Sequence, residues 1–175
     1  MPIDGPTLKR FRNPVFVETG TFRGDGINAA IDAGFAKICS IELSPDLHAK
    51  ARARHSVGRR VNLVCGSSAD ELPRLIADMD TPITFWLDAH GYEGCGEGDH
   101  PCPLLAELDA IAAHPLHDSH VVLIDDFHVI GRAFRADISE EAIRERLSRI
   151  NPNGFVFRMD SPRNQWDIMG MMPWI

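Results

Sequence analysis

The glycine-rich segment 84–103, TFWLDAHGYEGCGEGDHPCP, places an aspartate after an apolar run and then two histidines and two cysteines, all of which could bind a metal. They are Asp88, His90, Cys95, His100 and Cys102. Zinc prefers histidine and cysteine ligands, so the last four residues form one candidate Zn²⁺ site, although their spacing, H-x4-C-x4-H-x-C, is irregular for such sites. A second interpretation is a Cys95–Cys102 disulfide, which requires an oxidising compartment. The interpretation that we favour is a lid, residues 90–103, that excludes water from a pocket.

Carboxylates at the ends of apolar runs form a second set of candidates. Asp88 follows ITFWL, the pair Asp125 and Asp126 follows HVVLI, and Glu18 and Glu42 end the runs VFV and KICSI. A buried carboxylate is costly unless it binds something. Two adjacent carboxylates, such as Asp125 and Asp126, would also repel each other without a cation, unless one of them caps a helix and the other is exposed.

The elements that must position these side chains alternate between apolar runs and helical segments. Strands are predicted at 15–20, 37–43, 61–66, 83–89, 120–126, 155–160 and 166–171. Helices are predicted at 27–33, from Ser44 onwards, after Ser67, at 103–113, and up to Ile150 from a capping box of Asp137 with Glu140. Five strand–helix units predict a parallel sheet covered on both faces. The short connection between the last two strands predicts an antiparallel hairpin.

The expected fold class is therefore α/β, with a Rossmann-like, doubly wound, seven-stranded sheet that is mostly parallel and has an antiparallel last strand. A chain of 175 residues is expected to form a single domain, 1–175, with residues 1–14 as an N-terminal arm. In such sheets, ligands bind outside the carboxyl ends of the strands.

Charge and composition limit the classes of partner that the protein is expected to bind. The formal net charge is −7, which disfavours binding of nucleic acid or of an anionic membrane through the overall field. No apolar run approaches the ~18 residues of a membrane span, and the first residues lack the apolar core of a signal peptide. Cys39 and Cys65 lie in strand-like runs and are expected to be buried thiols. We therefore expect a cytoplasmic protein with no nucleic-acid and no membrane partner.

The first strand-to-helix turn indicates the kind of ligand. Its glycines, at 20, 24 and 26, do not follow the GxGxxG spacing of nicotinamide-binding folds. Glu18, two residues before Gly20, suits a cation such as the ammonium group of a methionine moiety and would repel pyrophosphate. Glu18, Gly20, Thr21 and Gly24 are thus candidate cofactor residues, and a nicotinamide oxidoreductase is disfavoured.

Two further strand ends fit a nucleoside. An acid at the position of Glu42 can accept both hydrogen bonds of a ribose diol. Gly66, Ser67 and Ser68 follow the third strand, where an adenine edge would lie, although Ser67 and Asp70 could serve only as helix caps.

These motifs carry a family resemblance. ETGTFRGDG, residues 18–26, resembles the first motif of S-adenosylmethionine-dependent methyltransferases, and especially of the macrocin O-methyltransferase group. LDAH, with Asp88, and LIDDFH, with Asp125 and Asp126, are similar to that group's later motifs, so the resemblance spans Val15 to Val129. It implies the class I methyltransferase fold, S-adenosylmethionine as cofactor with Asp88 beside it, and one Mg²⁺ held by Asp88, Asp125 and Asp126. It also implies that Asp88 is the base for an acceptor hydroxyl, whose pKa the metal lowers.

Two histidines lie just past these aspartates. His90 and His128 could each act as a base or as a donor to a metal ligand, or could be simple polar residues at the rim. The segment before the first strand is shorter than in the resembling group, and Glu42 stands where that group usually has an aspartate. The acceptor therefore cannot be transferred from the resemblance.

Two hypotheses follow. The first is a Mg²⁺-assisted O-methyltransferase acting on a small-molecule acceptor with hydroxyl groups, such as a sugar or natural product. The second is a non-catalytic module of the same fold that binds S-adenosylmethionine or a metal. The apolar C-terminal segment MGMMPWI, 169–175, could be an edge strand buried in a homodimer.

Overall fold

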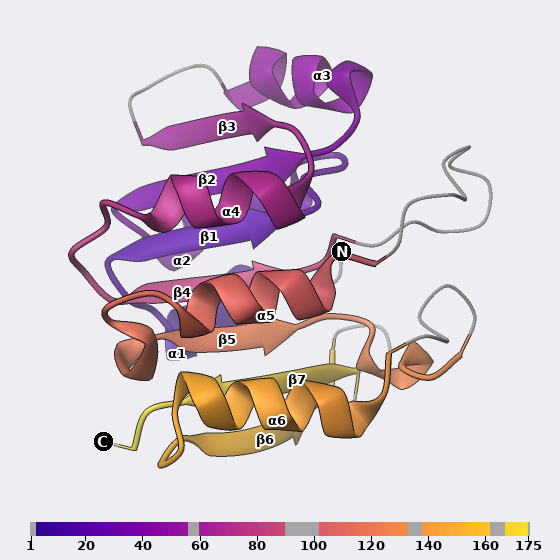
Figure 1. The fold of residues 1–175 in the computed structure, drawn as a ribbon. Coiled ribbons are helices and arrows are strands. Elements are labelled where there is room, and N and C mark those ends of the chain that lie inside the picture. Colours follow the sequence, from indigo (N-terminus) through magenta and orange to yellow (C-terminus); the bar gives the residue numbers. More distant parts are fainter. Residues whose placement is uncertain (1–2, 56–59, 90–101, 133–137, 162–166, 175) are drawn as a thin grey trace.

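A computed structural model describes residues 3–55, 60–89, 102–132, 138–161 and 167–174 of the chain. Its centre is one seven-stranded sheet with the order β3-β2-β1-β4-β5-β7-β6 (Figure 1). The strands are β1 (Val15–Thr19), β2 (Lys37–Glu42), β3 (Val61–Cys65), β4 (Ile83–Leu87), β5 (Val121–Ile124), β6 (Phe155–Met159) and β7 (Ile168–Met172).

The direction of the strands follows the predicted pattern. The strands β1 to β5 pair in parallel, whereas β7 is antiparallel to both β5 and β6. All residues of β1, β4 and β5 are buried, as expected for parallel strands with helices on both faces. The predicted fold class is confirmed.

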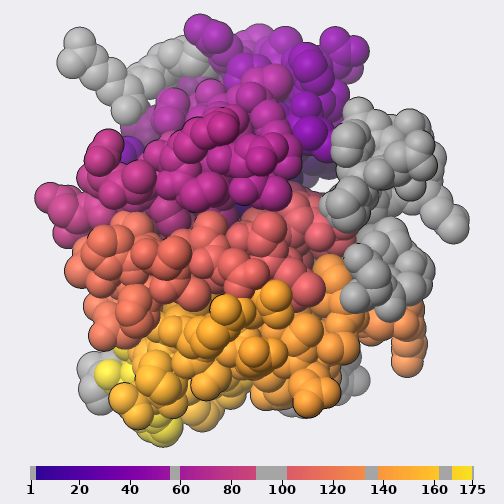
Figure 2. Space-filling model, in the orientation of Figure 1, coloured from indigo at the N-terminus to yellow at the C-terminus, as the bar shows by residue number. Residues whose placement is uncertain are grey.

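Helices cover the two faces. They are α1 (Gly5–Arg10), α2 (Asp25–Ala33), α3 (Pro45–His55), α4 (Ser68–Ile76), α5 (Leu104–Ala112) and α6 (Glu140–Ile150), with short 3-10 helices η1 (His117–Ser119) and η2 (Phe127–Val129). In Figure 1, α4, α5 and α6 lie in front of the sheet, and Figure 2 shows their segments, from magenta to orange, side by side on that face.

Each face of the sheet has its own apolar core. On the side of α4, α5 and α6, Leu72, Leu108 and Leu147 pack against strand residues such as Phe85. On the other side, α1 and α2 cover a second cluster that includes Trp86. Phe85 and Trp86 are consecutive in β4 and enter opposite cores because successive strand side chains point to opposite faces.

The N-terminal segment contains a helix that we did not predict. Asp4 caps α1 by accepting a hydrogen bond from the Thr7 amide at 2.8 Å. Ile3 and Leu8 are fully buried in the second core. This part of the predicted arm is therefore packed against the sheet domain.

Three predictions of local structure were wrong. Helix α6 is capped by Ser139, whose hydroxyl accepts from the Ala142 amide, and not by Asp137, which lies outside the described residues. The C-terminal strand β7 is not an edge strand, because it lies between β5 and β6. Cys65 is exposed, because β3 forms one edge of the sheet, whereas Cys39 is buried as predicted.

Within the described ranges, no helix combines the length and the apolarity that crossing a membrane would require.

Candidate functional site

The register of the sheet brings the predicted site residues to one edge. The amide of Gly20 donates to the carbonyl of Ile41 at 2.9 Å, and the amide of Asp88 donates to that of Thr19 at 3.1 Å. The amide of Asp125 in turn donates to the carbonyl of Leu87 at 3.1 Å. The parallel strands β2, β1, β4 and β5 therefore end level with one another, and the polar residues after them share one edge.

Three aspartates converge at this edge. Asp88, Asp125 and Asp126 each offer a carboxylate oxygen, and these oxygens lie within 4.8 Å of one another. Asp126 adopts a left-handed backbone conformation, with φ of 49°. Neighbouring side chains of an extended strand point to opposite faces, so this turn is what allows both members of the pair to reach Asp88.

The convergence has an electrostatic cost. The side chain of Asp125 is fully buried. Its pKa is raised to about 8, first because of burial and then because of the nearby charges of Asp88 and Asp126. A divalent cation at this point would offset both effects. The donor set consists only of oxygens and fits Mg²⁺.

Beside the aspartates lies a second cluster, in which a carboxylate holds a histidine. His128 Nδ1 donates to Asp167 Oδ1, and Ser161 Oγ donates to Asp167 Oδ2 at 3.0 Å. The backbone takes part as well, since the Phe127 amide donates to the Asp167 carbonyl at 2.7 Å. The carboxylate of Asp167 is buried, the His128 ring is 45% exposed, and both lie within 4.8 Å of an Asp126 oxygen.

Our sequence analysis missed Asp167. It stands directly before β7, which runs antiparallel to β5. The beginning of an antiparallel strand lies at the same edge as the ends of its parallel neighbours. An acid just before the last apolar run was therefore a signal that the predicted hairpin made available.

The turn after β1 holds a buried carboxylate. Glu18 is 2% exposed and accepts a hydrogen bond from Ser40 Oγ at 2.6 Å, while the Ser40 and Thr21 hydroxyls lie 2.6 Å apart. Burial raises the pKa of Glu18 to about 8, although the Ser40 hydrogen bond acts in the opposite direction. A cationic ligand would favour the charged form of this group.

Two glycines allow this turn to pack so closely. At Gly20, where φ is +83°, an added Cβ would lie 2.5 Å from the carbonyl oxygen of Asp88. At Gly26, in the first turn of α2, it would lie 1.7 Å from Glu18 Oε1. Glycine at these positions lets the turn approach β4 and lets the Glu18 carboxylate lie against α2. Gly26 was not among our candidate residues.

Glu42 binds the backbone of the same turn. Its Oε2 accepts from the Phe22 amide at 2.7 Å and its Oε1 accepts from the Ser44 amide at 2.9 Å. Each carboxylate oxygen has a second lone pair, so the group retains the capacity to accept hydrogen bonds from a diol. Gly24 lies in this turn with φ of +79°.

The end of β3 lies next to Glu42. The Gly66 amide donates to the Glu42 carbonyl at 2.9 Å. Ser67 occupies the N-cap position of α4, but its side chain makes no capping hydrogen bond. Ser67 is therefore the N-cap of α4 by position but not through a side-chain hydrogen bond, and Ser68 is buried beside it.

The remaining predicted residues lie outside the described chain. They are His90, Cys95 and His100, so the candidate zinc site, the disulfide and the lid are not tested. Cys102, at the start of the next described range, is half-buried.

The sequence matches no protein-family model. It also matches no curated protein.

Solved structures resemble the fold. An O-methyltransferase from Bacillus cereus in complex with SAH is 16% identical, with a TM-score of 0.58 over 96% of this chain and 78% of that one. CalS10, a SAM-bound amino pentose methyltransferase from Micromonospora echinaspora, is 12% identical, with a TM-score of 0.62 over 97% and 88%. The 23S rRNA methyltransferase ErmE is 16% identical, with a TM-score of 0.58 over 98% and 68%.

These similarities establish the class I methyltransferase fold for this chain. The second protein is named as an amino pentose methyltransferase and the third as an rRNA methyltransferase, so the fold alone does not select an acceptor.

Proposed function

We propose that this protein is an S-adenosylmethionine-dependent, Mg²⁺-assisted O-methyltransferase that acts on a small hydroxylated molecule. The observation that carries the proposal is the convergence of Asp88, Asp125 and Asp126 at the edge that also holds Glu18 and Glu42. The proposed Mg²⁺ site and the proposed site for S-adenosylmethionine, which is a cationic nucleoside, would thus lie side by side in a fold shared with methyltransferases.

The donor is proposed to lie across the ends of β1, β2 and β3. Glu18 would accept hydrogen bonds from the ammonium group of the methionine moiety. Glu42 would accept those of the ribose diol, and Gly66 to Ser68 would border the adenine. The depth of Glu18 supports this arrangement, because a buried carboxylate without a cation is costly. Gly20, Thr21 and Gly24 would shape the turn around the donor.

The acceptor hydroxyl is proposed to lie at the aspartates. Asp88, Asp125 and Asp126 would hold Mg²⁺, which when bound lowers the pKa of a coordinated hydroxyl. The backbone carbonyl of Asp88 lies beside Gly20 of the proposed donor turn, which supports the proposal that the Asp88 carboxylate would accept the hydroxyl proton close to the donor. His128, held by Asp167, is a second acceptor for that proton, and His90 keeps the same proposed role.

The class of acceptor rests on charge and on the site. A net charge of −7 and the carboxylates at this edge suit a neutral or cationic sugar or natural product better than a polyanion. A cytoplasmic location also belongs to the proposal. A homodimer also remains a proposal, without an identified interface.

Methyl transfer to a panel of sugars and diols tests the proposal. We expect S-adenosylhomocysteine to form with at least one neutral acceptor, and to form faster with Mg²⁺ than with a chelator. If the protein binds S-adenosylmethionine but methylates nothing in the panel, the non-catalytic module is the better description.

A further inference from the structure

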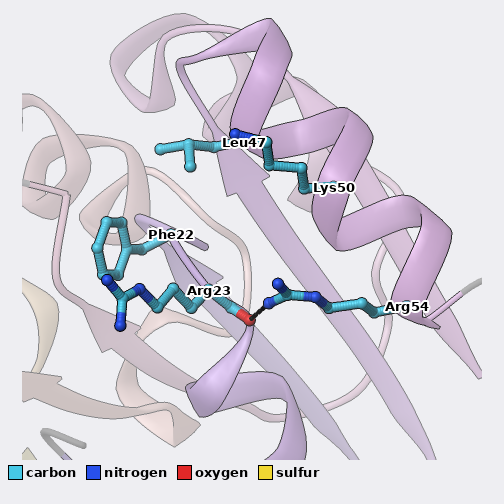
Figure 3. Close-up of a pocket in the computed structure, with 5 residues that line it drawn as sticks. All are labelled: Phe22, Arg23, Leu47, Lys50 and Arg54. Atoms are coloured by element: carbon cyan, nitrogen blue, oxygen red, sulfur yellow. Dashed lines mark hydrogen bonds between the residues drawn. The ribbon is translucent and has the colours of Figure 1, made fainter.

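A cavity of about 380 Å³ lies between the turn after β1 and helix α3. Phe22 and Arg23 line it from the turn, and Leu47, Lys50 and Arg54 line it from the helix (Figure 3). The three helix residues are spaced three and four positions apart, so they lie on one face of α3.

The cavity is cationic in an acidic protein. Arg23, Lys50 and Arg54 bring three positive charges to it, although the chain carries a net charge of −7. In the described part of the chain, none of these three side chains forms an ion pair, whereas arginines of α6 pair with nearby acids. In the described residues, no acidic side chain therefore lies within ion-pair distance of these three cations.

One wall of the cavity is aromatic and strained. Phe22 has φ of +46°, a conformation that only glycine adopts without strain, and its side chain is 39% exposed. The hydrogen bond from its amide to Glu42 holds the turn in this form. Strain of this kind persists where the surroundings enforce it and is concentrated at ligand sites. The Arg23 guanidinium lies over the Phe22 ring, 5.1 Å from its centroid.

The two walls are fixed to each other. Arg54 Nη1 donates to the carbonyl of Arg23 at 3.0 Å, as Figure 3 shows. Next to this bond, an added Cβ on Gly24 would lie 2.5 Å from His55 Nε2, so the end of α3 packs directly on the turn. A ligand would therefore meet a cavity whose walls are held in place before it binds.

We propose that this cavity binds a phosphate monoester whose organic part is apolar or aromatic. Three cations suit a dianion, and the forked guanidinium groups match phosphate oxygens. Phe22 and Leu47 would contact the organic part. The site goes beyond the proposed methyl transfer, because none of the five lining residues is among those proposed to hold S-adenosylmethionine or Mg²⁺.

Calorimetric titration with phenylphosphonate, a non-hydrolysable aryl analogue, tests the site, with inorganic phosphate as the second probe. We expect phenylphosphonate to bind the full chain more tightly than phosphate does. Arg23→Ala and Lys50→Ala should each weaken binding about tenfold, because each removes one charge-assisted contact. Arg52→Ala, which removes an exposed cation of α3 that does not line the cavity, should leave the affinity unchanged.

Absence of phenylphosphonate binding would overturn the proposal. So would an equal loss in Arg52→Ala, since that would assign binding to the general charge of α3. The same proteins are titrated with S-adenosylmethionine. If phenylphosphonate binds and S-adenosylmethionine does not, the anion site stands and the proposed methyl transfer fails. Thermal unfolding of each variant shows whether it is folded.

Discussion

The buried carboxylate of Asp167 binds Nδ1 of His128, and so fixes the ring beside Asp126. The two residues are 39 positions apart in the chain. The antiparallel strand β7 brings them together, since it begins where β5 ends. A histidine held in this way has its other ring nitrogen available to a substrate.

Asp167→Asn should therefore impair methyl transfer without affecting donor binding. We expect kcat to fall about 10- to 100-fold, because the amide no longer favours one tautomer and one orientation of His128. Nitrogen-15 NMR of the His128 ring should show the loss of the Nδ1-protonated form. Asp160→Asn, which changes an acid just before Ser161, is the comparison variant. Unchanged kcat in Asp167→Asn would contradict a role for this pair.

Asp125→Asn should remove the response to magnesium. The exchange conserves shape and neutralises a group whose pKa is already raised to about 8, so the metal-free protein should keep its stability at neutral pH. The affinity for Mg²⁺ should fall about tenfold or more, since a charged ligand is lost. Thermal unfolding with and without Mg²⁺ measures this. Asp78→Asn removes an exposed acid on another loop and should retain the full response. A full response in Asp125→Asn would refute the three-aspartate site.

Gly26→Ala should be destabilising through one specific contact. The new methyl group would meet Glu18 Oε1, and a buried side chain cannot move away freely, so we expect a loss of about 1–3 kcal/mol in the free energy of unfolding. In a Glu18→Ala background the same change should cost much less, because the clashing atom is gone. Urea unfolding of the four proteins gives the coupling energy. Additive effects would mean that the two residues do not contact each other.

Acid should destabilise the protein through a buried histidine pair far from the site. The Ile83 amide donates to His120 Nδ1 at 3.2 Å, His120 Nε2 lies 2.9 Å from His114 Nδ1, and His114 Nε2 lies 3.1 Å from the Ile76 carbonyl oxygen. All the hydrogen bonds in this series can form together only when both histidine rings are neutral. Burial, followed by the charge of His114, lowers the pKa of His120 from its ordinary value of 6.5 to about 4.

The direction of this pH effect on stability follows from the different proton binding of the folded and unfolded chains. Between pH 4 and pH 6.5, His120 binds a proton in the unfolded chain but not in the folded chain. The stabilisation is complete above pH 6.5 and is lost as the pH falls towards 4, on the order of 3 kcal/mol in total. Urea unfolding across this range should show the decline, and His120→Gln should show a flatter profile from a lower starting stability. Identical pH profiles for the two proteins would contradict this explanation.

The sequence predicted the features that depend on the alternation of apolar runs and helical segments. It missed the features that depend on contacts between elements that are distant in the sequence. The alternating apolar runs predicted the sheet. The rule that ligands bind at the ends of parallel strands predicted that Asp88 and Asp125 belong to one site. Cys65 was misjudged because an edge position depends on the strand order and not on the strand itself. Helix α1 is only six residues long, and its burial rests on contacts with α2 that no local pattern reveals. The need for glycine at position 26 arises from its contact with Glu18, which the sequence does not reveal.

Calorimetry with S-adenosylmethionine, in the presence and absence of Mg²⁺, tests the proposed function most directly. We predict that one molecule binds per chain in both conditions. Glu42→Gln should weaken binding, because Glu42, which we propose as the ribose ligand, also binds the Phe22 amide. Glu141→Gln, on the exposed side of α6, should bind as the parent does. Absence of S-adenosylmethionine binding in both conditions would contradict the proposal.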